Sequence, residues 1–432
     1  MKIYRYPSKA AERRLDAIVK RGVAFKAKDI REVTKIIDDV RRNGDRALLQ
    51  YTRRFDAPAM KAGRLQVSSA EFADAAQRVD RVFKRALNRA VNQIESFHGI
   101  QRPKSWILAD RPGTWLGQMV NPVDAAGVYV PGGKGGSTPL VSSVLMGAIP
   151  AKIAGVKRVI MVTPPSPDGG IDPHLLVAAQ KVGIDAVFKV GSAWAVAALA
   201  YGSETIPRVD VIVGPGNIYV TLAKKIVAGT VGIDMVAGPS EILVIADGTA
   251  DPEFIAADLL SQAEHDPLAA AMLITDSSAT AEATKSALSR QLPLLSRSEI
   301  AAESLSRYGA VLVVPSIDDA IMLANRIAPE HLELHTESPF DQVGRIRNAG
   351  AVFLGQYTPE PVGDYIAGPN HVLPTAGTAR FSSALSVDHF MKKTSILHYS
   401  EATFRKEARD IVKLAEIEGL TGHANAVKMR LR

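Results

Sequence analysis

Apolar and polar positions recur along the chain in patterns that predict helices first and then two arrays of strands and helices. Residues 28–56 and 69–100 show the three- and four-residue spacing of amphipathic helices. Core positions with this spacing include Ile30, Val33, Ile36, Ile37 and Val40. Between Trp115 and Val130 the pattern becomes that of strands, and it closes at a Pro-Gly-Gly turn.

Beyond Val130, strands and helices alternate and are separated by short turns rich in Gly and Pro. The first array is expected to have strands at 126–130, 158–163, 186–190 and 209–213 and helices at 138–154, 173–182, 192–201 and 217–228. The second is expected to have strands at 241–246, 270–275, 310–314, 332–335 and 350–354 and helices at 252–263, 280–291, 317–327 and 339–347. Such alternation is typical of α/β units with a parallel sheet covered by helices. The two ends, 1–22 and 385–432, are predicted to be charged and helical.

Composition narrows the class of protein. A length of 432 residues suggests two or three core-bearing units, and 47% hydrophobic with 22% charged residues is ordinary for a globular protein. The absence of Cys excludes disulfides, thiolate metal sites and a Cys nucleophile. The sequence shows neither a signal peptide nor a membrane span, so we expect a cytoplasmic protein with no membrane partner.

The net charge of +7 is unevenly distributed. Residues 1–110 hold 25 Lys and Arg against 13 Asp and Glu, a net of +12. A basic region of this kind could contact nucleic acid. However, the charges are mixed in sign along amphipathic helices, which favours solvated helix faces and no specific nucleic-acid partner.

The segment 258–266 places Gln262 and His265 three residues apart on a predicted helix, so both side chains share one face. In a chain without Cys, a transition-metal site must use nitrogen and oxygen donors such as these. Taken alone, the pair is more often solvated or packed in a core than bound to a metal.

Two glycine turns, 130–136 and 213–217, each follow a predicted buried strand. Glycine permits close backbone approach, and the helix that follows favours phosphate at its N-terminus. Neither matches the dinucleotide-binding pattern, and in the second turn Tyr219 stands where the third glycine would be. Each alone is more often a simple tight turn, but two at the carboxyl ends of strands indicate a ligand crevice.

Carboxylate and imidazole groups occur together at three further places. Glu330 and His331 are adjacent at the entry to a strand, where they could act as base and water activator. Asp364 and His371 lie in a loop rich in Gly and Pro, and Glu418 and His423 flank a predicted helix break. For each of these places alone, ordinary exposure to water is the favoured interpretation.

Taken together, these segments resemble the histidinol dehydrogenase family. The matching segments are VYVPGG, VGPGNIYVTLAKK, GTVGIDMVAGPSEILVIAD, DLLSQAEHD, APEHLEL, NAGAVFLG, GDYIAGPNHVLPT and GLTGHANAVKMRL. They occur in family order from about residue 25 to the end of the chain, which is far more specific than any single motif.

The resemblance implies an α/β fold of two Rossmann-like domains with parallel sheets, aldehyde-dehydrogenase-like, plus a small N-terminal arm and a helical C-terminal tail. The expected division is 1–22 for the arm, 23–128 with 240–384 for the first domain, 129–239 for the second, and 385–432 for a tail exchanged in a homodimer. The implied reaction is NAD-dependent four-electron oxidation of L-histidinol through L-histidinaldehyde to L-histidine, with one Zn²⁺ per subunit.

The resemblance also assigns residues. The zinc ligands would be Gln262, His265, Asp364 and His423, and the catalytic pair would be Glu330 and His331. Substrate contacts would come from Ser240, His331, His371 and Glu418 together with the zinc-bound groups. NAD contacts would come from Tyr129 and Asn217. In the homodimer, the partner subunit would supply Glu418 and His423 to each shared site.

Two departures from the family pattern concern NAD. Trp194 stands where the family usually has Gln, and an indole cannot repeat the hydrogen bonds of an amide, although it could stack on or border the cofactor. The first glycine loop, within 132–145, is about three residues longer than the family's usual form.

Two rival functions stay open. Relatives of this family oxidise other small diols, such as sulfopropanediol, with the same zinc and catalytic groups. They would not need Glu418 as a partner for an ammonium group, so Glu418 favours histidinol. A non-catalytic metal-binding or nucleic-acid-binding protein is the other rival, and the combination of Glu330, His331 and both glycine turns disfavours it.

Overall fold

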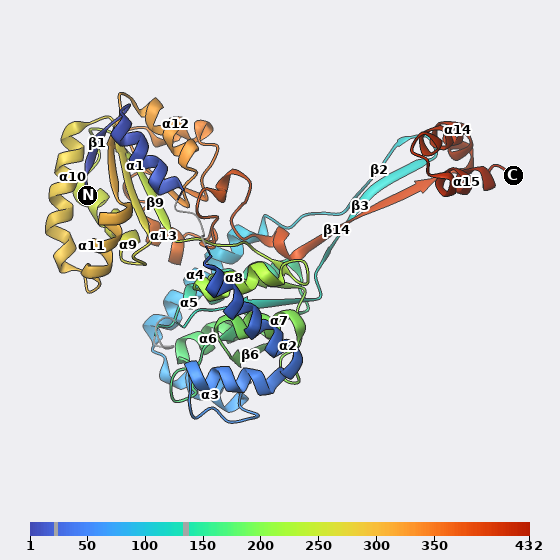
Figure 1. The fold of residues 1–432 in the computed structure, drawn as a ribbon, viewed down its shortest axis with the longest axis horizontal. Helices are drawn as coiled ribbons and strands as arrows, with labels where there is room; N and C mark the ends of the chain where they lie inside the picture. The colour runs from blue at the N-terminus through green and yellow to red at the C-terminus, as the bar shows by residue number, and fades with distance from the viewer. Residues whose placement is uncertain (21–24, 133–137) are drawn as a thin grey trace.

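Two parallel sheets covered by helices, together with an extended ribbon that carries the C-terminal helices, make up the molecule (Figure 1). The structure is a computed structural model, and it describes residues 1–20, 25–132 and 138–432. No helix in these ranges is long and apolar enough to cross a membrane.

The six-stranded sheet is parallel throughout, and all residues of its central strand β9 are buried. Its strands lie in the order β1 (Ile3–Arg5), β11 (Ala310–Val313), β10 (Ala270–Thr275), β9 (Glu241–Ala246), β12 (His331–His335) and β13 (Ala351–Leu354). Helices α1 (Lys9–Val19) and α12 (Ile317–Ile327) share a core with one face. Helices α9 (Pro252–Ala263), α10 (Ser278–Gln291) and α11 (Ser298–Tyr308) share a core with the other. A central strand covered on both faces reads as a continuous apolar run, as EILVIA does here.

The five-stranded sheet is also parallel. Its order is β6 (Ala186–Lys189), β5 (Arg158–Thr163), β4 (Ala125–Tyr129), β7 (Val211–Val213) and β8 (Gly232–Ile233). One face packs on α3 (Ser69–Arg78), α4 (Arg81–Gly99), α5 (Val141–Ala154) and α6 (Pro173–Lys181). The other packs on α2 (Ala27–Phe55), α7 (Ser192–Tyr201) and α8 (Ile218–Val227).

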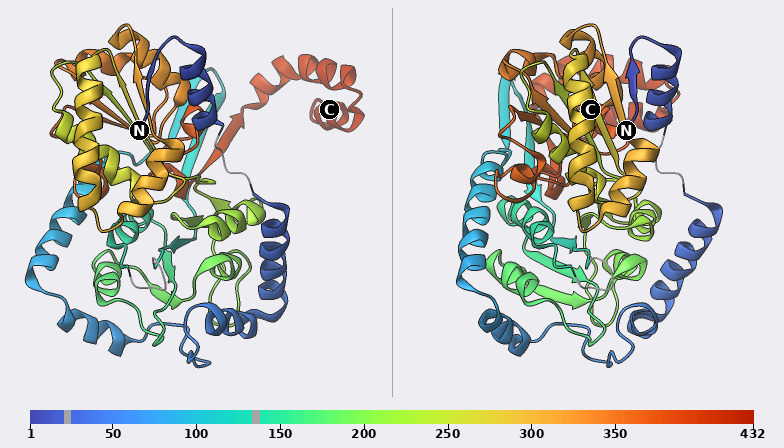
Figure 2. Two further views of the ribbon diagram at one scale, coloured as in Figure 1. Left: turned by 60° about the vertical axis from the view of Figure 1, so that its left-hand side comes forward. Right: turned by 90° about the vertical axis from the view of Figure 1, so that its left-hand side faces the viewer.

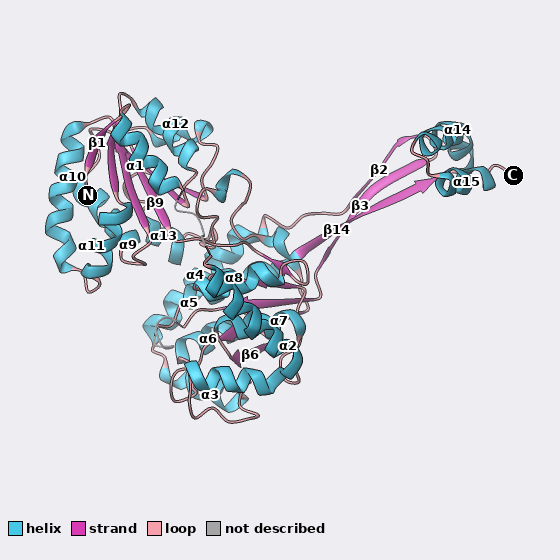
Figure 3. Cartoon of the chain, in the orientation of Figure 1, coloured by secondary structure: helices cyan, strands magenta, loops and turns pink. Residues whose placement is uncertain are grey.

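A three-stranded antiparallel ribbon leaves this body and carries the C-terminal helices (Figures 1 and 2). Its order is β14 (Met391–Tyr399), β3 (Thr114–Pro122) and β2 (Trp106–Arg111). Helices α14 (Glu401–Ile417) and α15 (Thr421–Met429) lie at its far end (Figure 3).

Most expected strands and helices occur where the apolar periodicity places them, and several local expectations were wrong. Residues 3–5 form a strand at the edge of a sheet, although the expected arm is helical throughout. Residues 391–399 form a strand within the predicted helical tail, because they pair with the whole of β3. Residues 339–345 form 3₁₀ turns instead of an α-helix, and α11 was not expected.

The helices of residues 27–99 share their cores with the five-stranded sheet. The expected division into domains groups these helices instead with the six-stranded sheet, and that division stays a prediction.

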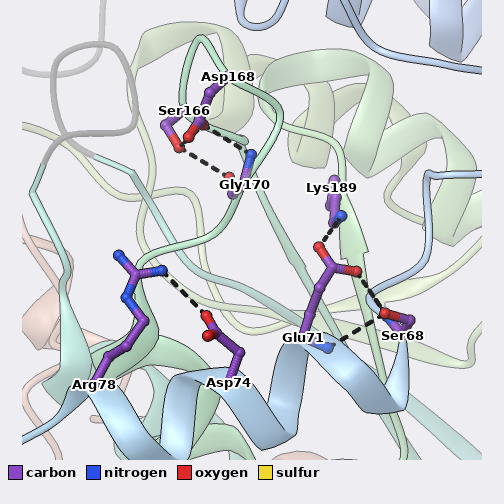
Figure 4. Close-up of polar contacts among 8 residues, drawn as sticks. All are labelled: Ser68, Glu71, Asp74, Arg78, Ser166, Asp168, Gly170 and Lys189. Atoms are coloured by element: carbon purple, nitrogen blue, oxygen red, sulfur yellow. Dashed lines mark hydrogen bonds and ion pairs between the residues drawn. The ribbon is translucent and has the colours of Figure 1, made fainter.

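A polar contact shows how α3 is held in place: Glu71 completes a capping box with Ser68 and also binds the buried Lys189 of β6 (Figure 4).

Candidate functional site

The turn between α12 and β12 brings Glu330 and His331 to the start of a buried strand. Helix α12 ends at Ile327, and Ala328 follows in the left-handed conformation at φ 54°. Pro329 then prevents the helix from continuing. His331 consequently begins β12 beside Ile242, at the amino ends of β9 and β12.

His331 is held in one tautomer by its neighbours. Its Nδ1 lies 3.0 Å from the backbone oxygen of Glu241 and 3.1 Å from Oε1 of Gln262. Both oxygens accept hydrogen bonds, so Nδ1 carries the ring proton and Nε2 keeps its lone pair. Nε2 has no hydrogen-bond partner among the residues that the structure describes. Burial lowers the pKa of His331 to about 4, so the ring is neutral near pH 7.

Glu330 is buried beside this ring. Its Oε2 accepts a hydrogen bond of 2.9 Å from the backbone N–H of Glu241, and the hydroxyl of Ser240 also bonds its carboxylate. Burial raises the pKa of Glu330 well above its usual value, and the negative charges of Glu241 and Asp364 add to this shift. A carboxyl group of raised pKa is a stronger base once ionised.

His265 and Asp364 come together near the same end of the sheet, and a third residue joins them. The possible ligand atoms of His265, Glu360 and Asp364 all lie within 4.8 Å of one another. Glu360 and Asp364 stand four apart on the short helix α13 (Glu360–Tyr365), and Oε1 of the buried Glu360 lies 3.9 Å from Nε2 of His331. Displacement of water by neighbouring atoms lowers the pKa of His265, while the charge of Asp364 opposes this effect.

Glu360 was missed by reasoning from the sequence. Its four-residue spacing from Asp364 could have indicated it, had residues 360–365 been predicted as a helix. The Gly and Pro residues of that segment favour a loop and hide this signal.

The loop after α13 carries His371 and joins the two α/β units. Nε2 of His371 is buried and has no hydrogen-bond partner among the described residues. The neighbouring Asn370 donates a 2.8 Å hydrogen bond to the backbone oxygen of Met146 in α5. Positive charge on His371 lowers the pKa of His331, which places the two imidazoles near each other.

Tyr129 and Asn217 lie at the carboxyl ends of the paired strands β4 and β7. Tyr129 is buried, and its hydroxyl accepts a 3.0 Å hydrogen bond from the backbone N–H of Ser192. Asn217 is exposed at the start of α8, and its side chain caps the N–H groups of Tyr219 and Val220.

Between these residues, Gly214 adopts φ 117°, and an added Cβ would lie 2.1 Å from the backbone oxygen of Tyr129. The ammonium group of the buried Lys224 donates a 2.9 Å hydrogen bond to the backbone oxygen of Gly214. The backbone N–H of Gly214 donates a 2.7 Å hydrogen bond to the carboxylate of Asp234. Lys224 and Asp234 also form an ion pair, which fixes the turn from both sides.

Trp194 is 4% exposed and stacks between two rings of α2. Its ring centroid lies 5.7 Å from that of Tyr51 and 5.6 Å from that of Phe55, at interplanar angles of 20° and 22°. This packing gives the indole a structural role, while its contact with NAD stays a prediction. Part of the longer first glycine loop, residues 133–137, lies outside the described residues.

Glu418 and His423 do not join this cluster within one chain. Both residues are exposed, at the end of α14 and in α15. Figure 1 shows these helices at the far end of the ribbon, well away from α9 and α13. The single chain therefore gathers Gln262, His265, Asp364 and the residues around His331, and it leaves two predicted members outside.

The cluster combines a neutral imidazole with a free lone pair, a buried carboxyl group and a set of nitrogen and oxygen donors. An imidazole of this kind can accept a proton, and a carboxyl of raised pKa can activate water. The donor set suits a borderline divalent cation such as zinc.

Known proteins resemble this chain over nearly its whole length. A family model described as histidinol dehydrogenase matches residues 20–431. The histidinol dehydrogenase of Desulfotalea psychrophila is 56% identical over 400 residues, which are 93% of this chain and 92% of that protein. That of Geobacter sulfurreducens is 54% identical over 417 residues, 96% of each chain.

A solved structure also resembles this chain over its whole length. The crystal structure of histidinol dehydrogenase from Elizabethkingia anophelis has a TM-score of 0.93 and 38% identity, and the match covers 100% of this chain and 98% of that one. This match confirms the α/β fold with parallel sheets and a helical C-terminal end.

Proposed function

The chain belongs to the histidinol dehydrogenase family, and we propose from this that it oxidises L-histidinol through L-histidinaldehyde to L-histidine with NAD. It is thus an oxidoreductase of histidine biosynthesis that acts on a small molecule. The observation that carries the proposal is the neutral His331, whose free Nε2 lies 3.9 Å from Glu360, a member of the donor group of His265 and Asp364, while the Glu330 carboxyl lies 3.8 Å from Nδ1.

NAD suits the carboxyl ends of the paired parallel strands β4 and β7. The turn at Gly214 leaves no room for a Cβ, as is typical where a backbone must approach closely. Asn217 lies exposed at the N-terminus of the helix α8 that follows, and a helix N-terminus favours phosphate oxygens. We assign Tyr129 and Asn217 to cofactor binding and include Trp194 as a residue that borders it.

Zinc suits the donors on α9 and α13 and in the turn after α9, beside the six-stranded sheet. His265 and Asp364 offer an imidazole and a carboxylate within 4.8 Å of each other, together with Glu360. The carbonyl oxygen of Gln262 has two lone pairs, so it could serve a metal while it accepts from His331. We propose Gln262, His265, Asp364 and the partner's His423 as the ligands of one Zn²⁺ per subunit.

Two NAD molecules, bound in succession, would each accept one hydride, and zinc would hold and orient the imidazole and amino nitrogens of the substrate. Nε2 of His331 accepts the hydroxyl proton as the first hydride leaves. The imidazolium so formed has the carboxyl of Glu330 at 3.8 Å from Nδ1 and that of Glu360 at 3.9 Å from Nε2, and a negative charge on either would stabilise it.

The ionised Glu330 then removes a proton from the water that adds to the aldehyde carbon. His331, once it has released the first proton to solvent, accepts a second hydroxyl proton from the hydrated aldehyde, while the second hydride leaves and the acid forms. Ser240 and His371 lie beside these groups and are assigned to the substrate, and Glu418 of the partner would pair with its ammonium group.

The ribbon supports the proposed homodimer. A three-stranded ribbon with two helices cannot bury its own apolar face, and α14 and α15 bury little beyond Ala408, Ala415 and Ala424. The apolar side chains left exposed on it include Trp106, Ile107, Leu108, Trp115, Leu397, Leu414 and Ile417. An exposed patch of this extent marks an interface, and a second copy would cover it while bringing Glu418 and His423 to a site.

We also propose a cytoplasmic enzyme without a specific nucleic-acid partner. Basic residues of the N-terminal region pair with acids on their own helices, as Lys28 does with Glu32 and Arg78 with Asp74. Such pairs intersperse negative charge among the basic side chains of these helices, which disfavours tight binding to a phosphate backbone.

The test is the yield of NADH per histidinol consumed, with and without a chelator. We expect two NADH per histidinol and loss of turnover after zinc removal, restored by added Zn²⁺. Turnover of a sulfonated diol with no NADH from histidinol would instead identify the related diol dehydrogenase.

Mixed dimers test the shared site. We expect His265→Asn and His423→Asn to be inactive alone, because each site would lose one zinc ligand. Co-expression should restore about a quarter of the sites, since random pairing makes half of the dimers mixed and each mixed dimer has one intact site. No recovery in dimers shown to be mixed would argue against exchange of the tail.

A further inference from the structure

A second group of metal-binding side chains lies under the proposed active site, and we call it the buried triad: Asp258, Glu333 and His335. Residues two apart on a strand share a face, so Glu333 and His335 follow His331 along the same face of β12. Asp258 lies on α9, one turn before Gln262. The triad is therefore a layer of polar residues between β12 and α9, distinct from the proposed catalytic zinc ligands.

The atoms of the triad converge in the interior. Nε2 of His335 lies 3.3 Å from Oε2 of Glu333 and 3.6 Å from Oδ2 of Asp258. The side chains of His335 and Glu333 are fully buried and that of Asp258 is 10% exposed. None of these three atoms has a hydrogen-bond partner in the part of the chain that the structure describes.

Protons alone leave this group poorly satisfied. Asp258 and Glu333 can share one proton in a hydrogen bond between their carboxyls. That proton still leaves both ring nitrogens of His335 without a hydrogen-bond partner among the described residues. A buried polar atom without a partner destabilises the fold, so an arrangement that satisfies His335 and both carboxyl groups at once is favoured.

We propose that the buried triad binds a divalent transition-metal cation, such as Zn²⁺, through Nε2 of His335, Oε2 of Glu333 and Oδ2 of Asp258. Ligands about 2.0–2.1 Å from a tetrahedral zinc stand about 3.3–3.4 Å apart, close to the spacings found here. Two carboxylates neutralise the charge of the cation, and an imidazole with two oxygens is a donor set that zinc accepts.

The position of the triad makes this second cation structural. Oε1 of Glu333 accepts a 2.8 Å hydrogen bond from the backbone N–H of Glu360, the first residue of α13. A cation held by Glu333, His335 and Asp258 therefore ties together α9, β12 and the start of α13. These three elements carry Gln262, His331 and Asp364.

The experiment counts metal per chain after removal of all metal with a chelator, reloading with Zn²⁺ and removal of unbound ion. We expect the wild-type protein to bind two Zn²⁺, a count that rests in part on the proposed catalytic zinc. The His265→Asn/Asp364→Asn variant should retain one ion, and the Asp258→Asn/His335→Asn variant should bind one fewer than the wild type. The Glu337→Gln/Asp341→Asn variant changes two exposed carboxylates of the same region and should match the wild type.

The His265→Asn/Asp364→Asn variant separates the two proposals. If it binds no zinc, the buried triad is not a metal site, whatever the activity of the wild type. If it binds one, anomalous diffraction at the zinc edge should place the ion among His335, Glu333 and Asp258. A peak elsewhere overturns the proposal, and this decides the question even if the Asp258→Asn/His335→Asn variant fails to fold.

Discussion

The glycine turn after β7 offers a sharp test of the proposed NAD crevice. In Gly214→Ala, the new Cβ would lie 2.1 Å from the backbone oxygen of Tyr129, at a backbone φ of 117° that L-residues rarely adopt. That oxygen belongs to the end of a paired strand, so the neighbour that must give way is backbone and not a flexible side chain.

The structure sets the size of the effect. Ordinary van der Waals contact begins at 3.4 Å, so the turn must move by about 1.3 Å relative to β4. Lys224 and Asp234 resist this shift, because they hold the backbone oxygen and the N–H of Gly214 through hydrogen bonds of 2.9 and 2.7 Å. A displacement of about 1 Å can cost about 10²-fold in rate, and a strained backbone conformation costs about 1–3 kcal/mol.

We therefore expect Gly214→Ala to lower kcat/KM for NAD by about 10²-fold, mostly through KM, and to lower the Tm. Gly229→Ala is the matched control, because Gly229 also has positive φ, at 94°, but a Cβ added there would meet nothing within 4 Å. The assay is initial NADH formation with NAD varied at saturating histidinol, with unfolding followed by circular dichroism. Equal effects of the two variants on KM for NAD would refute the role of this turn.

Three further changes test the proton chemistry and the electrostatics. His331→Gln should reduce kcat by about 10²–10⁴-fold at unchanged zinc content, because the lost group accepts protons and is not a ligand; loss of zinc would contradict this. Glu330→Gln should slow the second oxidation more than the first, so that histidinaldehyde accumulates in single turnovers, and equal slowing would refute that division of roles. Burial raises the pKa of Asp56 from 3.8 to about 6, so its ionisation weakens folding as pH rises between these values. Asp56→Asn should therefore raise stability by at most about 3 kcal/mol at pH 7 and leave it unchanged below pH 3.8, as measured by Tm at both pH values.

Periodicity predicted most of the fold because buried parallel strands read as continuous apolar runs. EILVIA at β9 and the strand–helix alternation on both sides of it are local signals of this kind. The strand β14 could not be predicted in the same way. Its residues are mostly exposed and alternate weakly, and its conformation depends on pairing with β3, which lies far earlier in the chain.

The candidate site was predictable to the extent that its residues are neighbours in sequence. Gln262 with His265, and Glu330 with His331, are visible as close pairs in the sequence, although the predicted helix ends at Ala263, before His265, and β12 begins only at His331. The hydrogen bond between Gln262 and His331 is not visible, because it joins α9 to β12 across the packed interior. The same holds for Glu360, which reaches the site only because Glu333 anchors the start of α13.

The polar side chains between α9 and β12 show what the helix α9 contributes to the molecule. Asp258 and Gln262 stand one turn apart on the face that meets β12, and His265 follows at the end of the helix. The side chains of β12 repeat the arrangement with His331, Glu333 and His335. A polar layer between a helix and a central strand is costly unless every group is paired. With the proposed cation in the buried triad, these elements would be held together directly under the proposed catalytic pair, so that the proposed partner subunit would complete a site whose other donors are already in place.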